Sequence, residues 1–305
     1  MVPRAGSGVN RDDFFTAAPY RRFTEFTGPG ADRRAVLCSV LKELLLPYAV
    51  LDIAGKRHIV AGPGVREGEA PGIILTAHYD RSPRSSGAND NGAAVFLLAE
   101  TAARVRRGGI PVLFVFTDGE ELSGDEGLQN QGAYGLGMYL REKGFDGARI
   151  FCFDACGTGD TLIISTTADQ LLKGREENPG TEALRRKVQE LRRTALDAAR
   201  TARLERVLLI PTPFSDDGGF LRAGLAAQTI TVLPRKEAAP FAALVRRKGE
   251  VAAALLSRAA ARPKDRGSIP ETWRCLNGPS DSPLRLTPEH WKQVTAFAAA
   301  LISGS

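Results

Sequence analysis

Polar side chains that can bind metals or transfer protons follow several apolar stretches of this chain, at the point where each stretch ends. His78 and Asp80 follow GIILTA, Glu120 and Glu121 follow IPVLFVFTDG, and Asp154 follows ARIFCF. The chain has only three histidines in 305 residues, so one of them at the end of an apolar run is informative. Imidazole together with carboxylates suits zinc or a similar divalent metal. The first hypothesis is therefore a metal site.

Each of these residues also has a purely structural explanation. A single histidine can end a strand with its hydrogen bonds satisfied, and Asp80 can simply orient it. Asn89 or Asp90, in GANDNG, can cap the helix that follows, and the pair Glu120 and Glu121 can favour a first helical turn. Clustered carboxylates, however, repel one another unless they are protonated or neutralised by a cation. Their joint placement after apolar runs favours a metal site.

The elements that must position these side chains alternate between apolar strands and amphipathic helices. Strands are predicted over 50–55, 57–63, 72–80, 110–118, 148–157, 208–214 and 224–234. Helices are predicted over 33–46, 93–107, 135–143, 185–206 and 287–302. This alternation predicts an α/β fold with helices on both faces of a central sheet. In such sheets ligands bind beyond the carboxyl ends of the strands, where the polar residues above are expected.

Length and composition limit the class of protein. With 43% hydrophobic residues, the chain can bury a sizeable core, and we expect a single domain over residues 1–305. Residues 1–30 are predicted to be an N-terminal extension, and 234–280 an irregular excursion. No stretch approaches the roughly 20 apolar residues that cross a bilayer, so no membrane association is expected.

The cysteines and the N-terminus bear on the compartment. The four cysteines form no CxxC pair, which is typical of reduced thiols in a reducing compartment. The N-terminal sequence has no apolar segment typical of a secretory signal. A cytoplasmic protein is therefore expected.

The net charge of +6 raises the question of nucleic-acid binding. The densest basic run, 185–206, has helical spacing with an apolar stripe, and no aromatic residues lie within it to stack on bases. A solvated helix face explains this run better, and no nucleic-acid partner is expected.

Four motifs occur in a characteristic order: HYD (78–80), GANDNGAAV (87–95), DGEE (118–121) and FDACG (153–157). This set resembles the zinc-dependent aminopeptidases with co-catalytic metals, the family that also contains the glutaminyl cyclases. SDDGGFLRAGLAA (215–227) resembles a later segment of that family. The resemblance extends from about residue 33 to 302. It implies a three-layer α/β/α sandwich with a central mixed, mostly parallel sheet, and a peptide as substrate.

The resemblance also implies a role for each candidate residue. His78 and Asp154 would bind the first zinc ion, Asp90 would bridge it to a second ion, and Glu121 would bind that second ion. Glu120 would be the general base. Asp80 would be the carboxylate behind the histidine ligand, as is usual at metal sites.

The chain departs from the family pattern at two positions. Asp217 stands where a histidine follows Ser215-Asp216 in the family, and Asn277, in NGPSDS, stands where a histidine binds the second metal. An amide oxygen is a weaker zinc ligand than imidazole. One firm zinc site is therefore expected, with a second, weaker divalent site.

Three functions agree with these observations. The first is a metal-dependent hydrolase that removes N-terminal residues from peptides, with Glu120 as general base. The second is a glutaminyl-cyclase-like acyltransferase with one metal, which normally relies on the same missing histidine. The third is a non-catalytic binding scaffold, against which the retained Glu120 argues. A serine hydrolase is disfavoured because no GxSxG motif is found. The oligomeric state is not predicted.

Overall fold

A computed structural model of the chain describes residues 14–16, 18–62, 70–105, 111–122, 126–173, 175–248, 251, 255 and 266–304. Eight strands in these residues form one sheet in the order β1-β2-β4-β3-β5-β8-β6-β7. Their bounds are β1 Tyr48–Ile53, β2 Lys56–Ala61, β3 Ile73–His78, β4 Val112–Thr117, β5 Arg149–Phe153, β6 Thr161–Ser165, β7 Val207–Ile210 and β8 Ala227–Leu233. The four central strands, β4, β3, β5 and β8, are parallel, and β2 and β6 join them antiparallel. The predicted mixed, mostly parallel sheet is confirmed.

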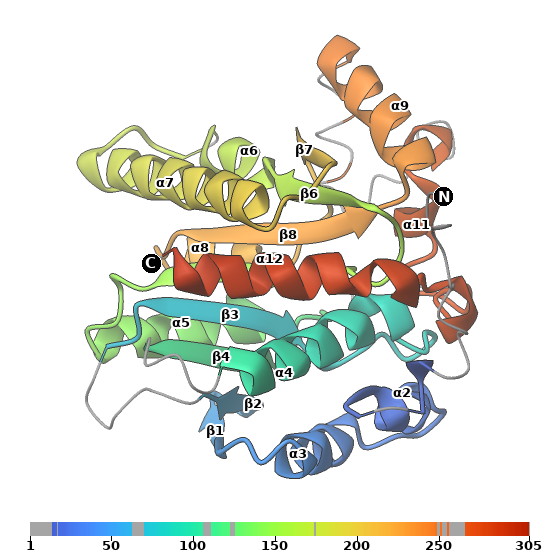
Figure 1. Cartoon of the computed structure of the whole chain (residues 1–305). Coiled ribbons are helices and arrows are strands. Elements are labelled where there is room, and N and C mark those ends of the chain that lie inside the picture. Colours follow the sequence, from blue (N-terminus) through green and yellow to red (C-terminus); the bar gives the residue numbers. More distant parts are fainter. Residues whose placement is uncertain are drawn as a thin grey trace.

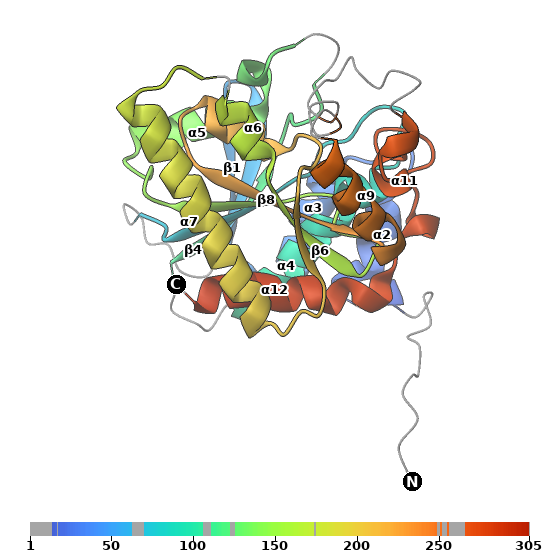
Figure 2. The same cartoon turned by 90° about the horizontal axis from the view of Figure 1, so that it is seen from above.

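Helices cover both faces of the sheet (Figures 1 and 2). The longer ones are α3 Arg33–Glu43, α4 Ala93–Val105, α5 Gly132–Glu142, α7 Pro179–Thr201, α9 Arg235–Arg247 and α12 Trp291–Ser303. The shorter ones are α2 Phe23–Thr27, α6 Thr167–Lys173, α8 Asp216–Arg222 and α11 Glu271–Arg274. Helices α4, α7 and α12 lie on one face, and α5 and α8 lie on the other (Figures 1 and 2). The three-layer α/β/α sandwich is therefore also confirmed.

The core is divided by the sheet because successive strand residues point to opposite faces. On β3, Leu75 packs in the cluster that includes α4 and α12, whereas its neighbour Ile74 packs with Leu136 of α5 and Phe220 of α8. Every residue of β3 is buried, as expected for a parallel strand with helices on both sides. This rigid central strand carries His78 as its last residue.

Two segments differ from their predicted character. Of the predicted N-terminal extension, 1–13 and 17 lie outside the described residues, but Phe23 and Phe26 are fully buried and their rings lie 5.2 and 5.3 Å from that of Phe96. This part of the chain belongs to the core. In the segment 234–280, predicted to be irregular, the structure has the helices α9 and α11, while 249–250, 252–254 and 256–265 lie outside the described residues.

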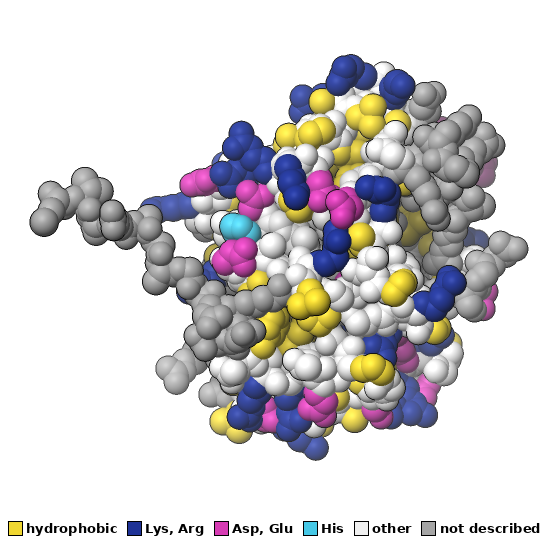
Figure 3. All heavy atoms as spheres, turned by 90° about the vertical axis from the view of Figure 1, so that its right-hand side faces the viewer, with side chains coloured by type: hydrophobic (Ala, Val, Ile, Leu, Met, Phe, Trp, Pro, Cys, Tyr) yellow, Lys and Arg dark blue, Asp and Glu magenta, His cyan; other side chains and the backbone are white. Residues whose placement is uncertain are grey.

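The surface gives two further observations. On the face shown in Figure 3, Lys and Arg side chains are interspersed with Asp and Glu and form no continuous basic patch. Across the described part of the chain, no helix has the length and apolar character needed to cross a bilayer.

Candidate metal centre and active site

The sheet brings the predicted site residues to one edge. In the parallel pair β3–β4, His78 lies opposite Thr117, so the segment with Glu120 begins beside the histidine. Strand β5 lies on the other side of β3 and ends at Phe153, directly before Asp154. Three separate motifs of the sequence therefore meet because their strands run in the same direction.

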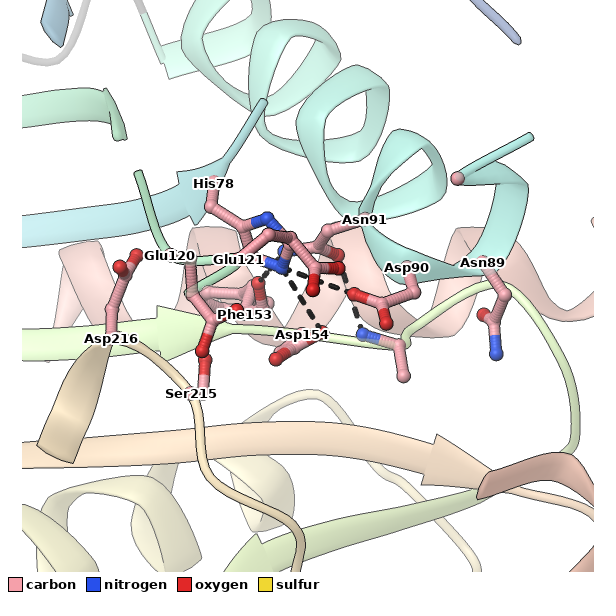
Figure 4. A network of polar contacts seen from close by, with 12 residues as sticks. His78, Asn89, Asp90, Asn91, Glu120, Glu121, Phe153, Asp154, Ser215 and Asp216 are labelled. Carbon is pink, nitrogen blue, oxygen red and sulfur yellow. Dashed lines mark hydrogen bonds and ion pairs between the residues drawn. The ribbon is translucent and has the colours of Figure 1, made fainter. Parts of the chain in front are cut away.

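His78 lies close to three carboxylates, and two of them, those of Asp90 and Asp154, can be seen beside it in Figure 4. Its Nε2 atom is 3.1 Å from Asp90 Oδ1 and 3.8 Å from Asp154 Oδ1, and its Nδ1 atom is 3.4 Å from Asp80 Oδ1. One ligand atom from each of His78, Asp90 and Asp154 lies within 4.8 Å of the others. Asp80 lies behind the ring, at the nitrogen that faces away from this group.

Asp90 is held in place by its neighbours in a wide turn, Ala88–Gly92, that leads into α4. Asn91 Nδ2 donates to the Phe153 carbonyl at 2.8 Å, and Asn89 Oδ1 accepts from the Gly157 amide at 2.7 Å. These two contacts join the turn to the end of β5. They keep Asp90 next to Asp154 without using either carboxylate.

Asp281 is a positioning residue that the sequence did not reveal. It is buried, and its carboxylate accepts from the backbone amides of Asn89 at 2.8 Å and Asp90 at 3.2 Å, and from the Ser85 hydroxyl at 3.1 Å. It therefore holds the turn through the backbone amides of Asn89 and Asp90. The only signal was its place four residues after Asn277, where the family pattern also has an aspartate.

Arg33 is a second residue without a sequence signal. Its side chain is buried, donates to the carbonyls of Asp80 at 3.0 Å and Gly87 at 3.1 Å, and lies over the Phe26 ring at 4.0 Å. Burial lowers the pKa of Arg33 to about 9 against the opposing effect of nearby carboxylates. A Cβ at Gly87, which has a φ of +60°, would lie 2.4 Å from Arg33 Nη1, so glycine is required there. Arg33 thus links the two loops that carry Asp80 and Asp90.

Asp80 contacts both glutamates of the DGEE motif, Glu120 and Glu121. Its Oδ1 accepts from the Glu120 amide at 3.2 Å, and its Oδ2 accepts from the Glu121 amide at 3.0 Å. Burial alone would raise the pKa of Asp80, but the contacts with His78 and these amides outweigh it and lower the pKa. Asp80 therefore stays ionised and orients the histidine and both glutamates.

The two glutamates have different partners. Glu120 is buried and accepts from Gln131 Nε2 at 2.8 Å, a contact that the sequence did not indicate. Glu121 faces Asn277: with the amide nitrogen turned toward it, Asn277 Nδ2 lies 2.7 Å from Glu121 Oε2. Asn277 therefore offers Glu121 a hydrogen-bond donor, whereas the sequence suggested an oxygen ligand for a metal.

Asp217, the other departure from the family pattern, does not join the group. It is buried in the first turn of α8, and burial raises its pKa to about 7. Its neighbour Asp216 accepts from the Thr117 hydroxyl at 2.5 Å and also lies apart from the trio (Figure 4). Within the described residues, the metal-type cluster of three or more ligands consists of His78, Asp90 and Asp154 alone.

The electrostatics of this cluster favour a cation. Burial, reinforced by Asp154, raises the pKa of Asp90 to about 6, and burial with the charge of Asp90 raises the pKa of Glu121 to about 8. Burial also raises the pKa of Glu120 above its ordinary value. For His78, burial acts downward, but the carboxylates, Asp154 foremost, raise the pKa. Positive charge at this point relieves the mutual repulsion of the carboxylates.

The donor set fits a divalent metal by its chemistry and by its unused atoms. His78 Nε2 and Asp154 Oδ1 are buried and make no hydrogen bond of good geometry to any described residue. Buried polar atoms normally have a bonding partner, and a bound metal ion would provide one for both of these atoms. One imidazole and two carboxylates form a three-ligand set of the kind that catalytic zinc sites use.

A cavity of about 490 Å³ opens beside the cluster. Carboxylates of the site line it, and Phe214, Trp273 and Leu276 contribute apolar side chains. Its size and mixed lining are typical of a small-ligand pocket. The site is thus open to a substrate on one side and buried in the sheet on the other.

Comparisons with known proteins give the family and the fold. The sequence profile of peptidase family M28 matches residues 60–243, more than half of the chain. Comparison with curated protein sequences finds no significant match.

Three solved structures illustrate the shared fold. A zinc aminopeptidase from Bacillus subtilis is 21% identical with a TM-score of 0.53, over 81% of this chain and 49% of that protein. This chain therefore spans about half the length of the Bacillus enzyme. A leucine aminopeptidase precursor from Bacteroides thetaiotaomicron is 15% identical with a TM-score of 0.62, over 97% of each chain. A glutaminyl cyclase from Porphyromonas gingivalis is 16% identical with a TM-score of 0.59, over 97% of this chain and 98% of that one.

The part of the chain that matches the family profile contains the candidate site. The matched residues 60–243 contain all four motifs whose side chains meet at the carboxyl edge of the sheet. With this match, and with the fold shared with the aminopeptidases and glutaminyl cyclases, the chain belongs to peptidase family M28.

Proposed function

We propose that this protein is a zinc-dependent aminopeptidase that removes N-terminal residues from peptides. The observation that carries the proposal is the convergence of His78, Asp90 and Asp154 beside a pocket that Glu120 also lines, with His78 Nε2 and Asp154 Oδ1 free of hydrogen bonds to described residues. Membership of peptidase family M28 supports a metal-dependent peptidase reaction.

His78, Asp90 and Asp154 are the residues that would hold the metal. When bound there, a divalent cation would make a water molecule more acidic and polarise the scissile carbonyl. Asp80 keeps the imidazole in the orientation that directs Nε2 toward the two carboxylates. Asn89, Asn91 and Asp281 keep the turn of Asp90 in register with β5, so the ligand set is preorganised.

Glu120 would accept the proton of the attacking water and then deliver it to the leaving amine. Burial raises the pKa of Glu120, which makes its carboxylate a stronger base than an exposed glutamate. The hydrogen bond from Gln131 and the contact of the Glu120 amide with Asp80 fix its position. The carboxylates that line the pocket would attract the α-ammonium group of a peptide, which favours cleavage at the N-terminus.

The glutaminyl-cyclase-like reaction is the second candidate. It is favoured by the single three-ligand cluster, because that branch acts with one metal, whereas Asn277 in place of the histidine on which that branch normally relies counts against it. The similarity to the Porphyromonas enzyme over almost the whole of both chains also supports it.

One experiment tests both candidates. Protein purified without chelator is expected to contain about one zinc per chain by elemental analysis and to hydrolyse aminoacyl anilides, whereas the N-acetylated anilides are expected to remain intact. A peptide with N-terminal glutamine serves as the second substrate. Ammonia release from that peptide without anilide hydrolysis would select the cyclase, and no reaction of either substrate with metal-loaded protein would contradict an enzymatic function.

Asn277→His is expected to strengthen a second metal site. Imidazole is a better zinc ligand than an amide, and it would replace the donor that now occupies Glu121. Asn277 has a φ of +61°, a conformation in which histidine is comparatively frequent, so the backbone tolerates the change. Calorimetric titration of metal-free protein with zinc should show one tight site in the wild type and tighter binding of a second zinc in the variant. Two equally tight sites in the wild type would contradict the assignment.

A further inference from the structure

The pocket beside the metal cluster is lined by side chains of both charges. Asp90, Glu120, Glu121 and Asp154 supply the negative charges. Among the described residues that line the pocket, Arg84 is the one cation. Its side chain is exposed, and it makes no hydrogen bond or ion pair with any described residue, in contrast to the nearby Arg81. A cation that the protein leaves free at a pocket wall is available to a ligand.

The backbone at Arg84 is held from both sides. Ser82, Pro83, Arg84 and Ser85 form a tight turn in which the Ser85 amide donates to the Ser82 carbonyl at 3.0 Å. Proline at the second position of such a turn presets its conformation. The turn therefore presents Arg84 from a fixed base.

Residues on either side anchor this turn to the rest of the site. Arg81 donates to the carbonyls of Thr27 at 3.2 Å and Gly28 at 3.0 Å on its N-terminal side. On its C-terminal side, the hydroxyls of Ser85 and Ser86 contact Asp281, the residue that also holds the Asp90 turn. The backbone around Arg84 and the turn of Asp90 thus share one anchor, which keeps Arg84 and the metal cluster in a constant relation.

We infer that Arg84 binds a carboxylate of a short peptide whose α-amine lies beside the carboxylates of the same pocket. This inference rests on the proposed aminopeptidase function and names the substrate class: zwitterionic short peptides. The carboxylates and Arg84 in the pocket wall attract the oppositely charged groups of one molecule and disfavour the reversed orientation. The carboxylate can come from the C-terminus of the peptide or from an acidic side chain, since a guanidinium binds both in the same bidentate way.

The test compares ligands that differ only in one carboxylate. Leu-Gly and Leu-Gly-amide form the first pair, and Leu-Asp-amide and Leu-Asn-amide form the second. Binding is measured by calorimetry on zinc-loaded Glu120→Gln protein, in which turnover is suppressed. The carboxylate member of one pair is expected to bind about 3–10-fold more tightly, a modest factor because Arg84 is exposed. The preferred pair identifies the source of the carboxylate, and the preference should decrease at high salt.

Variants of Arg84 in the same background complete the test. Arg84→Ala should abolish the preference and leave binding of the amide ligands within about twofold of the parent protein. Arg84→Lys should retain part of it, because lysine keeps the charge without the planar fork. Arg193→Ala, which removes an exposed arginine of α7, is the control and should leave the preference unchanged.

The outcomes separate this inference from the proposed function. Equal binding of both members in both pairs, or a preference that survives in Arg84→Ala, would overturn the role of Arg84 even if the wild-type protein is an active aminopeptidase. An Arg84-dependent preference in a wild-type protein that hydrolyses no peptide would retain the carboxylate site and reject the peptidase function.

Discussion

Glu120→Gln is expected to reduce peptide hydrolysis about 10²–10⁴-fold, the usual contribution of a general base. Glutamine keeps the shape of glutamate but cannot accept the proton of the attacking water. Its side-chain oxygen can still accept from Gln131, and its backbone amide can still donate to Asp80. Metal content and Tm should therefore remain close to those of the wild type. Steady-state hydrolysis of an aminoacyl anilide, elemental analysis and thermal unfolding are the measurements.

A matched control separates the loss of a base from the loss of a negative charge. Glu142 is an exposed glutamate at the end of α5, so Glu142→Gln changes the net charge equally and should leave hydrolysis unchanged. Hydrolysis by Glu120→Gln at the wild-type rate would show that another group accepts the proton. A Glu120→Gln protein without metal would show that Glu120 is a ligand.

Asp90→Ala should remove the tightly bound metal, with a loss of zinc affinity of more than about 100-fold. This exceeds the 10–100-fold effect typical of residues that only support a ligand. The Asp90 carboxylate lies next to His78 Nε2, and in the proposed arrangement it would also serve any second ion. The turn itself should persist, because Asn89, Asn91 and Asp281 hold it through other atoms. Zinc titration by calorimetry and elemental analysis after dialysis are the measurements.

The thermal stability of Asp90→Ala shows whether the variant is still folded. Burial raises the pKa of Asp90 to about 6, so the free carboxylate is costly to keep charged, and its removal should not lower the Tm of the metal-free protein by more than a few degrees. Asp146→Ala, at an exposed aspartate, is the control for the loss of one charge. Stoichiometric metal in dialysed Asp90→Ala would refute the assignment of this ligand.

Several parts of the fold follow from local sequence patterns. The long apolar runs predict β3, β4 and β5 because a strand buried on both faces needs apolar residues throughout. Strand β6 and helix α8 were not predicted, and α8 contains the helix-weakening pair Gly218 and Gly219. Helix α8 forms because Phe220 and Leu221 are buried, and Gly219 lets it pack tightly against Gln131 and the start of α5.

The candidate site likewise contains some residues that the sequence predicted and others that it did not. His78, Asp90, Asp154 and Glu120 could be predicted because each belongs to a motif directly after a strand or before a helix, and parallel strands bring such positions together. Asp281 could not be predicted as a positioning residue: it contacts Asn89 across 192 positions of sequence, and no local pattern records such a contact. The same holds for the carbonyls of Asp80 and Gly87 that Arg33 binds.

The sequence by itself determined the chemical types of the ligands and their common edge, since residue identity and strand direction are local properties. Only the tertiary structure decided what the departures from the family pattern do. It places Asp217 in the first turn of α8 and sets the Asn277 amide against Glu121. The direction of a hydrogen bond depends on which groups long-range packing brings within reach, and Asn277 can donate or accept with the same side chain. For that reason, the sequence identified Asn277 as a departure from the family pattern, and the tertiary structure was needed to show that its partner is Glu121.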